Sequence, residues 1–191
     1  MSPKVLAFDT SGPYCAAAFL WRGDAIIRCE AMARGQAERL MGLLEEMLAD
    51  AGQTWRDLDA IGVGVGPGNF TGVRISVAAA RGLALALKIP AYGVNGFEQR
   101  GAAETIACVP GPRDQFFVNE PSGPRLMTRV EAAAAGLNLL DCSTPESRIS
   151  QIAQTAAARY PRPADPPRPL YIKPADAAPP RDAPPRILDD A

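Results

Sequence analysis

The stretch that decides the fold is "GVGVGPGNFTGVR", residues 62–74, which carries five glycines and one proline between two apolar runs. It lacks the Lys-Ser or Lys-Thr of a Walker-type phosphate loop, and its glycines do not follow the dinucleotide spacing G-x-G-x-x-G. The first glycines alternate instead, so Gly62, Gly64 and Gly66 share one face of a predicted strand and leave it without side chains. We therefore expect another segment to approach this face closely, and the Pro-Gly turn that follows to lead into a helix.

That long helix is predicted over "TGVRISVAAARGLALALK" (71–88), with Asn69 or Thr71 as its cap. Small residues recur every four positions on one side of it, which makes this shallow side the candidate neighbour of the glycine face. The small residues are Ala78, Gly82 and Ala86. A narrow charged stripe consists of Arg74, Arg81 and Lys88.

The predicted helix is otherwise apolar nearly all round, which requires cover on more than one side. The preceding helix, "QAERLMGLLEEMLADAG" (36–52), is also apolar over more than one face. Two such helices leave more apolar surface than one sheet covers, and a surface of this kind usually meets another protein. We therefore predict a partner-binding surface made of Leu40, Met41, Leu44, Met47, Leu48, Arg74, Val77, Arg81, Leu83 and Leu87.

Three alternatives to this interpretation stay open. The second half of the chain can cover the helices internally, or the exposed face can pair with a second copy in a homodimer. A phosphate bound at the helix start, near the backbone N–H groups of Phe70 to Gly72, is the third.

The remaining pattern predicts an α/β protein in two related halves. Apolar runs at 4–11, 14–21 and 25–31 form an antiparallel meander, and further strands follow at 58–65 and 91–94. A short helix (97–104) precedes a weaker repeat with strands at 105–109, 115–119, 124–128 and 138–142 and helices at 130–137 and 146–160. We expect domains at 1–100 and 101–160, and a Pro-rich tail at 161–191, ordered where "LYI" (170–172) finds a groove.

Composition excludes several classes of function. The chain has 191 residues, a formal net charge of −1 and no histidine, which argues against direct nucleic-acid binding and against Ser-His or Cys-His catalysis. Cys15, Cys29, Cys108 and Cys142 form no C-x-x-C pair, so we expect buried thiols in a reducing compartment and no metal site. No signal peptide or membrane-spanning apolar run is recognised, so we predict a cytoplasmic protein.

A second candidate site is "FDTS" (8–11), where Asp9 ends a predicted strand. Asp9 and Thr10 can belong to a partial nucleotide site, with Asp9 near a metal-bound phosphate. The alternative is a hairpin in which both side chains satisfy their own turn. An ATP-dependent phosphotransferase or carbamoyltransferase that uses Asp9 is the corresponding enzymatic hypothesis.

Several stretches resemble the bacterial TsaB family, the non-catalytic paralogues of the TsaD threonylcarbamoyltransferase. They are "LAFDTS" (6–11), "GVGPGNFTGVRISVAAARGLALAL" (64–87), "IPAYGVNGFE" (89–98) and "LYIKP" (170–174). The chain departs from the usual family wording at Asn69, at Gln36 and at 111–113, and its second half is short.

The resemblance implies an actin-like (ribonuclease H-like) fold of two tandem α/β domains with mixed sheets, the second one shortened. It also implies a non-catalytic subunit that pairs with TsaD through the two long helices, joined by the ATPase TsaE. TsaD transfers a threonylcarbamoyl group to the adenosine next to the anticodon of tRNA, so this chain is expected to meet tRNA only indirectly. No cofactor is expected on the chain alone, and ATP or ADP is expected only at the junction with TsaD.

Overall fold

A computed structural model describes residues 2–98, 106–111, 113–120, 123–136, 139–140 and 144–172. Cys142, most of the helix predicted at 97–104 and the tail beyond residue 172 lie outside these residues. Cys15 and Cys108 are buried, and Cys29 is half-buried. Burial raises the pKa of Cys15 and of Cys29 to about 11, so both thiols stay protonated at neutral pH.

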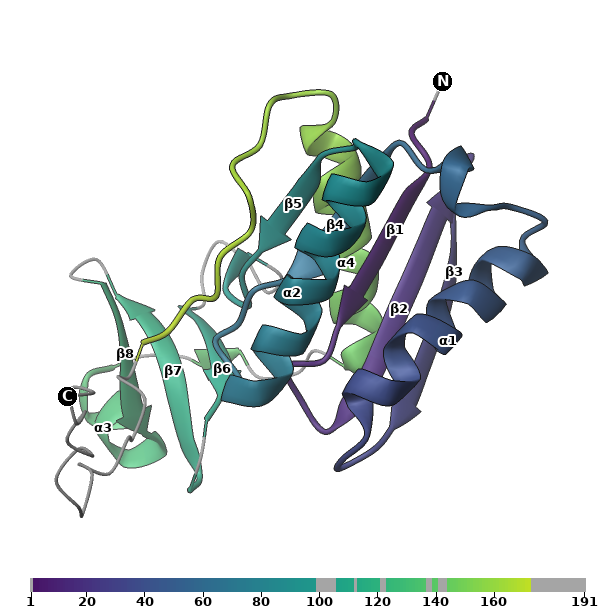
Figure 1. The fold of residues 1–191 in the computed structure, drawn as a ribbon. Coiled ribbons are helices and arrows are strands. Elements are labelled where there is room, and N and C mark those ends of the chain that lie inside the picture. The colour runs from purple at the N-terminus through teal and green to yellow at the C-terminus, as the bar shows by residue number, and fades with distance from the viewer. Residues whose placement is uncertain are drawn as a thin grey trace, which may run out of the picture.

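The first half of the chain forms a mixed five-stranded sheet (Figure 1). Its strands are β1 (Val5–Asp9), β2 (Tyr14–Trp21), β3 (Asp24–Ala31), β4 (Ala60–Gly64) and β5 (Ala91–Val94), in the order β3-β2-β1-β4-β5. β1, β2 and β3 pair antiparallel, which confirms the predicted meander, and β1, β4 and β5 pair parallel. The parallel pairs require helical crossovers, which the two long helices supply.

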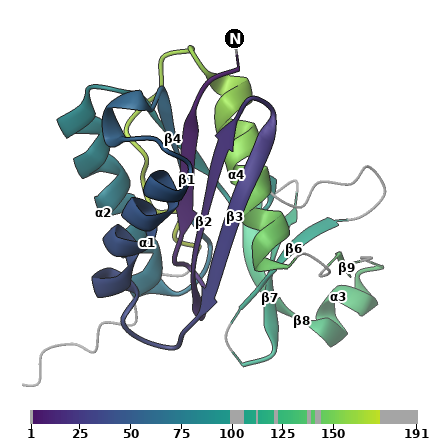
Figure 2. The same ribbon diagram turned by 90° about the vertical axis from the view of Figure 1, so that its right-hand side faces the viewer.

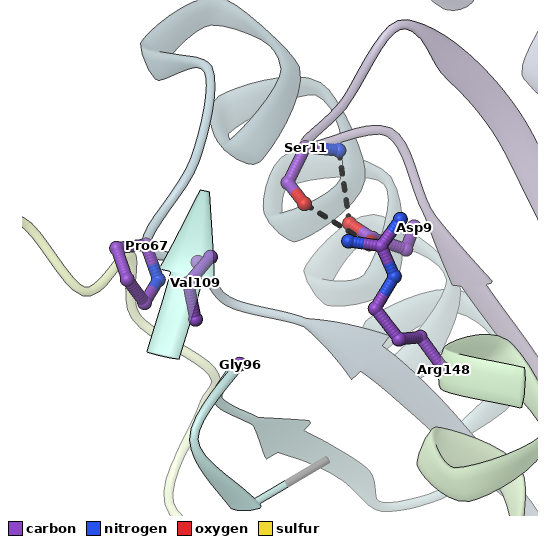
Figure 3. Close-up of a pocket in the computed structure, with 7 residues that line it drawn as sticks. Asp9, Ser11, Pro67, Gly96, Val109 and Arg148 are labelled. Atoms are coloured by element: carbon purple, nitrogen blue, oxygen red, sulfur yellow. Dashed lines mark hydrogen bonds between the residues drawn. The ribbon is translucent and has the colours of Figure 1, made fainter. Parts of the chain in front are cut away.

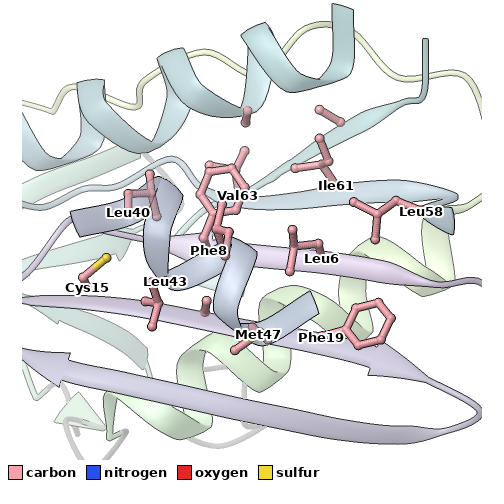
Figure 4. Packing of buried hydrophobic residues seen from close by; sticks show 14 of the residues in the cluster. Leu6, Phe8, Cys15, Phe19, Leu40, Leu43, Met47, Leu58, Ile61 and Val63 are labelled. Atoms are coloured by element: carbon pink, nitrogen blue, oxygen red, sulfur yellow. The ribbon is translucent and has the colours of Figure 1, made fainter. Parts of the chain in front are cut away.

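Two helices cover one face of this sheet: α1 (Gln36–Asp50) and α2 (Phe70–Leu87). A short 3-10 helix, η1 (Trp55–Asp57), follows α1. Asn69 caps α2, because its side-chain oxygen accepts a hydrogen bond of 2.8 Å from the backbone N–H of Gly72. Large apolar side chains from the sheet and α1 fill the space between them, as Figure 4 shows for Phe8, Leu43 and Met47. This is the main core of the protein.

A single helix, α4 (Pro145–Arg159), covers the opposite face of the sheet (Figure 2). A side-chain carbon added at Gly62 would lie 3.1 Å from the Ala156 Cβ and 3.2 Å from the Ile152 Cγ2, both on α4. The predicted close approach to the glycine face is therefore confirmed, but the expected neighbour was wrong. The small side of α2 lies elsewhere, because Ala78, Gly82 and Ala86 are exposed.

The second half forms a smaller four-stranded sheet in the order β8-β7-β6-β9. Its elements are β6 (Ile106–Pro110), β7 (Gln115–Glu120), β8 (Gly123–Thr128), α3 (Arg129–Ala134) and β9 (Leu139–Leu140). Met127, Phe116 and Val118 belong to its small core. The domain limits stay a prediction, and α4, which falls within the range 101–160, packs on the first sheet.

The chain after α4 runs as an extended strap, residues 161–172, back toward the start of α2 (Figure 1). The Tyr92 hydroxyl donates to the Arg162 carbonyl at 2.7 Å, and the Leu170 N–H donates to the Val65 carbonyl at 2.7 Å. Leu170 and Ile172 pack against a cluster that includes Val109 of the second sheet. The strap therefore ties the first sheet to the second.

By length and composition, α2 is the one helix among the described residues that could cross a membrane. This corrects the expectation that no apolar run is long enough. Length and composition alone are weak evidence for a membrane span here, because the buried residues of α2 pack into the main core. They are Gly72, Val73, Ser76, Val77 and Ala80.

Candidate functional site

The turn after β1 positions the first candidate residues, Asp9 and Thr10. The Asp9 carboxylate accepts hydrogen bonds from the Ser11 N–H at 2.9 Å, the Ser11 hydroxyl at 3.0 Å and the Tyr14 hydroxyl at 2.9 Å. The Thr10 hydroxyl donates to the Gly72 carbonyl at 2.6 Å. Asp9 is 3% exposed and Thr10 is fully buried. The Asp9 side chain bonds to Ser11 and Tyr14 of the β1–β2 hairpin, and the Thr10 side chain joins this turn to the start of α2.

Gly72 is required at this junction for lack of space. A side-chain carbon there would lie 1.9 Å from the Thr10 carbonyl oxygen, far inside contact distance. The glycine turn therefore lets the first turn of α2 press against the chain that follows β1. Packing explains this part of the glycine pattern without a phosphate.

Beside this turn lies a small pocket of about 200 Å³, part of it open to solvent (Figure 3). Its lining comes from both halves of the chain: Asp9, Ser11, Gly66, Pro67, Gly96, Val109 and Arg148. The Arg148 guanidinium carbon lies 5.1 Å from the centre of the Tyr14 ring, and its buried Nε has no hydrogen-bond partner among the described residues. Burial, and then the nearby Asp9 carboxylate, raise the pKa of Tyr14, so its hydroxyl remains a donor to Asp9.

These contacts define what the Asp9 turn can do chemically. A bound phosphate or metal would have to displace the hydrogen bonds that the Asp9 carboxylate already accepts from Ser11 and Tyr14. The hairpin alternative describes Asp9, whereas the Thr10 hydroxyl bonds to Gly72 of α2 and not to its own turn. A nucleotide site at Asp9 and Thr10 stays a prediction.

The second candidate site is the predicted partner-binding surface on α1 and α2. Five of its ten residues are core residues, each 4% exposed or less: Leu40, Leu44, Met47, Leu48 and Val77. They point into the main core, where they contact other residues of the same domain. A partner cannot reach a side chain that its own sheet covers, so these five are withdrawn from the predicted surface.

The other five predicted residues retain accessible surface. Met41 is 38% exposed, Arg74 and Arg81 are exposed, and Leu83 and Leu87 are half-buried at the edge of the core. Sequence reasoning left Leu85 out of the surface, although it is 81% exposed. Its spacing is a signal that identifies it, since Leu85 follows Arg81 by four positions and Ala78 by seven.

The exposed side of α2 is named here the α2 face and consists of Arg74, Ala78, Arg81, Gly82, Leu85 and Ala86. Its centre is apolar and almost free of bulk, because nothing lies within 4 Å of a side-chain carbon added at Gly82. Small residues of this kind allow a second helix to approach closely. The α2 face is therefore a shallow apolar surface with two exposed arginines.

Comparisons with known proteins identify relatives of this chain. Residues 27–111 match the family model of TsaD, described as tRNA N6-adenosine threonylcarbamoyltransferase. An uncharacterized protein of Mycobacterium tuberculosis is 34% identical over 199 residues, which cover 92% of this chain and 94% of that protein. The tRNA threonylcarbamoyladenosine biosynthesis protein TsaB of Haemophilus influenzae is 30% identical over 124 residues, 61% of this chain and 52% of that protein.

A crystal structure from Pseudomonas aeruginosa, of an uncharacterized protein with similarity to peptidase YeaZ, superposes with a TM-score of 0.69 at 25% identity. The match covers 90% of this chain and 100% of that one. The fold is therefore of the ribonuclease H-like, actin-like class, as the resemblance implied. The chain belongs to the TsaB family, and it spans about half the length of the H. influenzae TsaB that it matches.

Proposed function

We propose that this chain is a non-catalytic subunit in the biosynthesis of threonylcarbamoyladenosine in tRNA. In this function it docks on a TsaD-type transferase through the α2 face and holds that enzyme in its working conformation. The protein acts by binding one conformation of the enzyme better than another, which is the only way a partner can shift such an equilibrium. It meets tRNA only through the complex.

The observation that carries the proposal is the α2 face itself. Leu85 stands 81% exposed beside Ala78, Gly82 and Ala86, in a family whose named members take part in this biosynthesis. An exposed apolar patch rimmed by charges is typical of protein–protein contacts. A central leucine in such a patch is a candidate anchor for binding.

The absence of catalysis is supported by the Asp9 turn. An acid that serves a phosphotransferase must be free to contact a metal ion or a substrate hydroxyl. The Asp9 carboxylate instead accepts three hydrogen bonds from Ser11 and Tyr14. No comparison favours the alternative of an independent transferase.

The test is co-purification of this chain with the TsaD-type and TsaE-type proteins of the same cell, followed by a tRNA modification assay. Wild-type chain should bind the transferase and restore modification that is at background without it. Leu85→Asp should lose both, because it places a charge at the centre of the apolar contact.

Val130→Asp is the matched control, since Val130 on α3 is 79% exposed and lies away from the α2 face. It should bind and modify like the wild type. Normal modification with folded Leu85→Asp protein would contradict the assignment of the α2 face. Turnover of ATP by the isolated chain would contradict the non-catalytic role.

The proposed function also includes further partners, a cellular compartment and self-association of the chain. A TsaE-type ATPase joins the pair, and ATP or ADP binds only at the junction with the transferase. The complex works in the cytoplasm. In the absence of the transferase, the α2 face pairs with a second copy of the chain, which sedimentation of the isolated protein tests.

A further inference from the structure

Arg74, on the second turn of α2, is held by two aromatic residues. Its guanidinium carbon lies 3.7 Å from the centre of the Phe70 ring and 5.9 Å from that of Tyr171. The Arg74 Nε donates to the Tyr171 hydroxyl at 3.0 Å, and the two ring centres are 4.8 Å apart. A long, flexible side chain is therefore fixed at the rim of the α2 face.

Tyr171 reaches this position through the strap. The residue before it, Leu170, donates its N–H to the Val65 carbonyl and packs against the main core. The residue after it, Ile172, packs with Phe97 and other residues of the cluster between the sheets. Tyr171 itself is 44% exposed, and its position is set by the anchored neighbours on both sides.

In the described part of the chain, no carboxylate contacts the positively charged guanidinium group of Arg74. Arg28, Arg39, Arg125 and Arg159 each contact a carboxylate there, whereas Arg74 contacts two aromatic rings and the hydroxyl of Tyr171. The Nη groups of a guanidinium form a planar fork that matches a carboxylate. Stacking and the tyrosine hydrogen bond fix the plane of this fork before a partner arrives, which lowers the entropy lost on binding.

We propose that Tyr171 is a positioning residue that orients Arg74 to bind a carboxylate of the partner protein, on the same face of α2 as the apolar contact made by Leu85. This inference rests on the proposed function and adds the chemistry of the partner: an aspartate or glutamate next to small apolar residues. A protein carboxylate is favoured over an RNA phosphate because the α2 face combines Arg74 and Arg81 with the apolar residues Ala78, Gly82 and Leu85, and because the chain carries a formal net charge of −1.

The test measures affinity for the TsaD-type transferase at low and high salt. Arg74→Lys keeps the charge but loses the fork, and Tyr171→Phe keeps the ring but loses the hydroxyl. A charged hydrogen bond of this kind corresponds to roughly a tenfold to hundredfold loss of affinity for Arg74→Lys. Tyr171→Phe should lose about threefold to tenfold, and the double variant should lose no more than Arg74→Lys alone.

The matched control is Arg129→Lys, because Arg129 also lies over an aromatic ring, 4.7 Å from the centre of Phe116, but on α3. Its affinity should equal that of the wild type. Thermal unfolding of every variant checks that the fold is intact. The salt dependence of binding should be smaller in an Arg74→Gln variant than in the wild type.

The outcomes separate the two hypotheses. If the wild type does not bind the transferase, the proposed function fails. If the wild type binds and both single variants bind with the affinity of the wild type, the proposed function stands and this inference is overturned. Fully additive losses would overturn the positioning role of Tyr171. Direct tRNA binding by the isolated chain that Arg74→Gln removes would overturn the protein carboxylate as ligand.

Discussion

The helices α1 and α2 lie on the same face of the same sheet but differ in which side chains they bury and which they expose. α1 buries large side chains, among them Leu43 and Met47, and turns carboxylates outward. Two of these, Glu46 and Asp50, are paired with arginines. α2 buries mainly small residues and turns Leu85 outward, together with Arg74 and Arg81, which contact no carboxylate among the residues that the structure describes. The difference teaches that large apolar residues on a helix do not by themselves indicate an exposed surface, because those of α1 are mostly buried in the core.

The physical reason lies in how each helix meets the sheet. The buried side chains of α1 are long and fill the space above the strands, so Met41, 38% exposed, is the large apolar side chain that α1 leaves in contact with solvent. α2 begins at a turn where Gly72 contacts the Thr10 carbonyl, so its first residues lie close to the backbone beneath. Short side chains therefore fill the inner side of α2, and the apolar side chain of Leu85 faces outward. The large apolar side chains of α1 are mostly buried, whereas Leu85 of α2 is 81% exposed.

The largest expected effect comes from matched leucines on the two helices. Leu44→Ala should destabilise the protein by about 2–5 kcal/mol, because it leaves a cavity in the core. Leu85→Ala should change stability by less than about 0.5 kcal/mol, because the side chain is already in water. Urea unfolding measures both, and equal losses would remove the distinction between the helices.

An intermediate effect should separate two glycines. Gly62→Ala places a carbon 3.1 Å from the Ala156 Cβ and 3.2 Å from the Ala7 Cβ, so overpacking should destabilise the protein by about 1–3 kcal/mol. Gly82→Ala meets nothing within 4 Å and should stabilise α2 by up to about 1 kcal/mol. Thermal unfolding compares them. A stabilised Gly62→Ala protein would show that α4 does not close on this face as described.

Gly82 also sharpens the docking hypothesis. Gly82→Phe should leave the isolated protein folded, because the site is open, and should prevent docking by filling the shallow centre of the α2 face. Pull-down with the transferase measures this. Retained binding would place the contact on another surface.

The smallest expected effect concerns the charges of α1. Arg39 donates hydrogen bonds of 2.7 Å to Glu30 and to Glu46 and lowers the pKa of both carboxyls. A lowered pKa in the folded state gives stabilisation that is complete above the ordinary carboxyl pKa of about 4.3 and is lost as the pH falls through the folded pKa.

The stability difference between wild type and Arg39→Gln should therefore be present at neutral pH and disappear in acid. Arg81→Gln on α2 is the control, because no carboxylate contacts Arg81 among the described residues. Urea midpoints at several pH values measure both variants. A pH-independent difference for Arg39→Gln would show that the ion pairs do not form in solution.

The sequence predicted much of this molecule from local patterns. The meander, the long helices, the glycine requirement at Gly62 and the cap at Asn69 all follow from spacing and turn chemistry, and the structure confirms them. The resemblance carried by residues 64–87 predicted the family and the fold. The expected neighbour of the glycine face was wrong, because a strand face without side chains does not specify which helix covers it.

Tertiary structure alone decided which sides of the helices are buried. Periodicity shows which residues share a side, but a helix that is apolar all round gives no preference, since the hydrophobic effect has no direction. Leu44 inside and Leu85 outside follow from where the sheet lies. The contact of Arg74 with Tyr171, 97 positions apart in the chain, exists only because the strap returns to the start of α2.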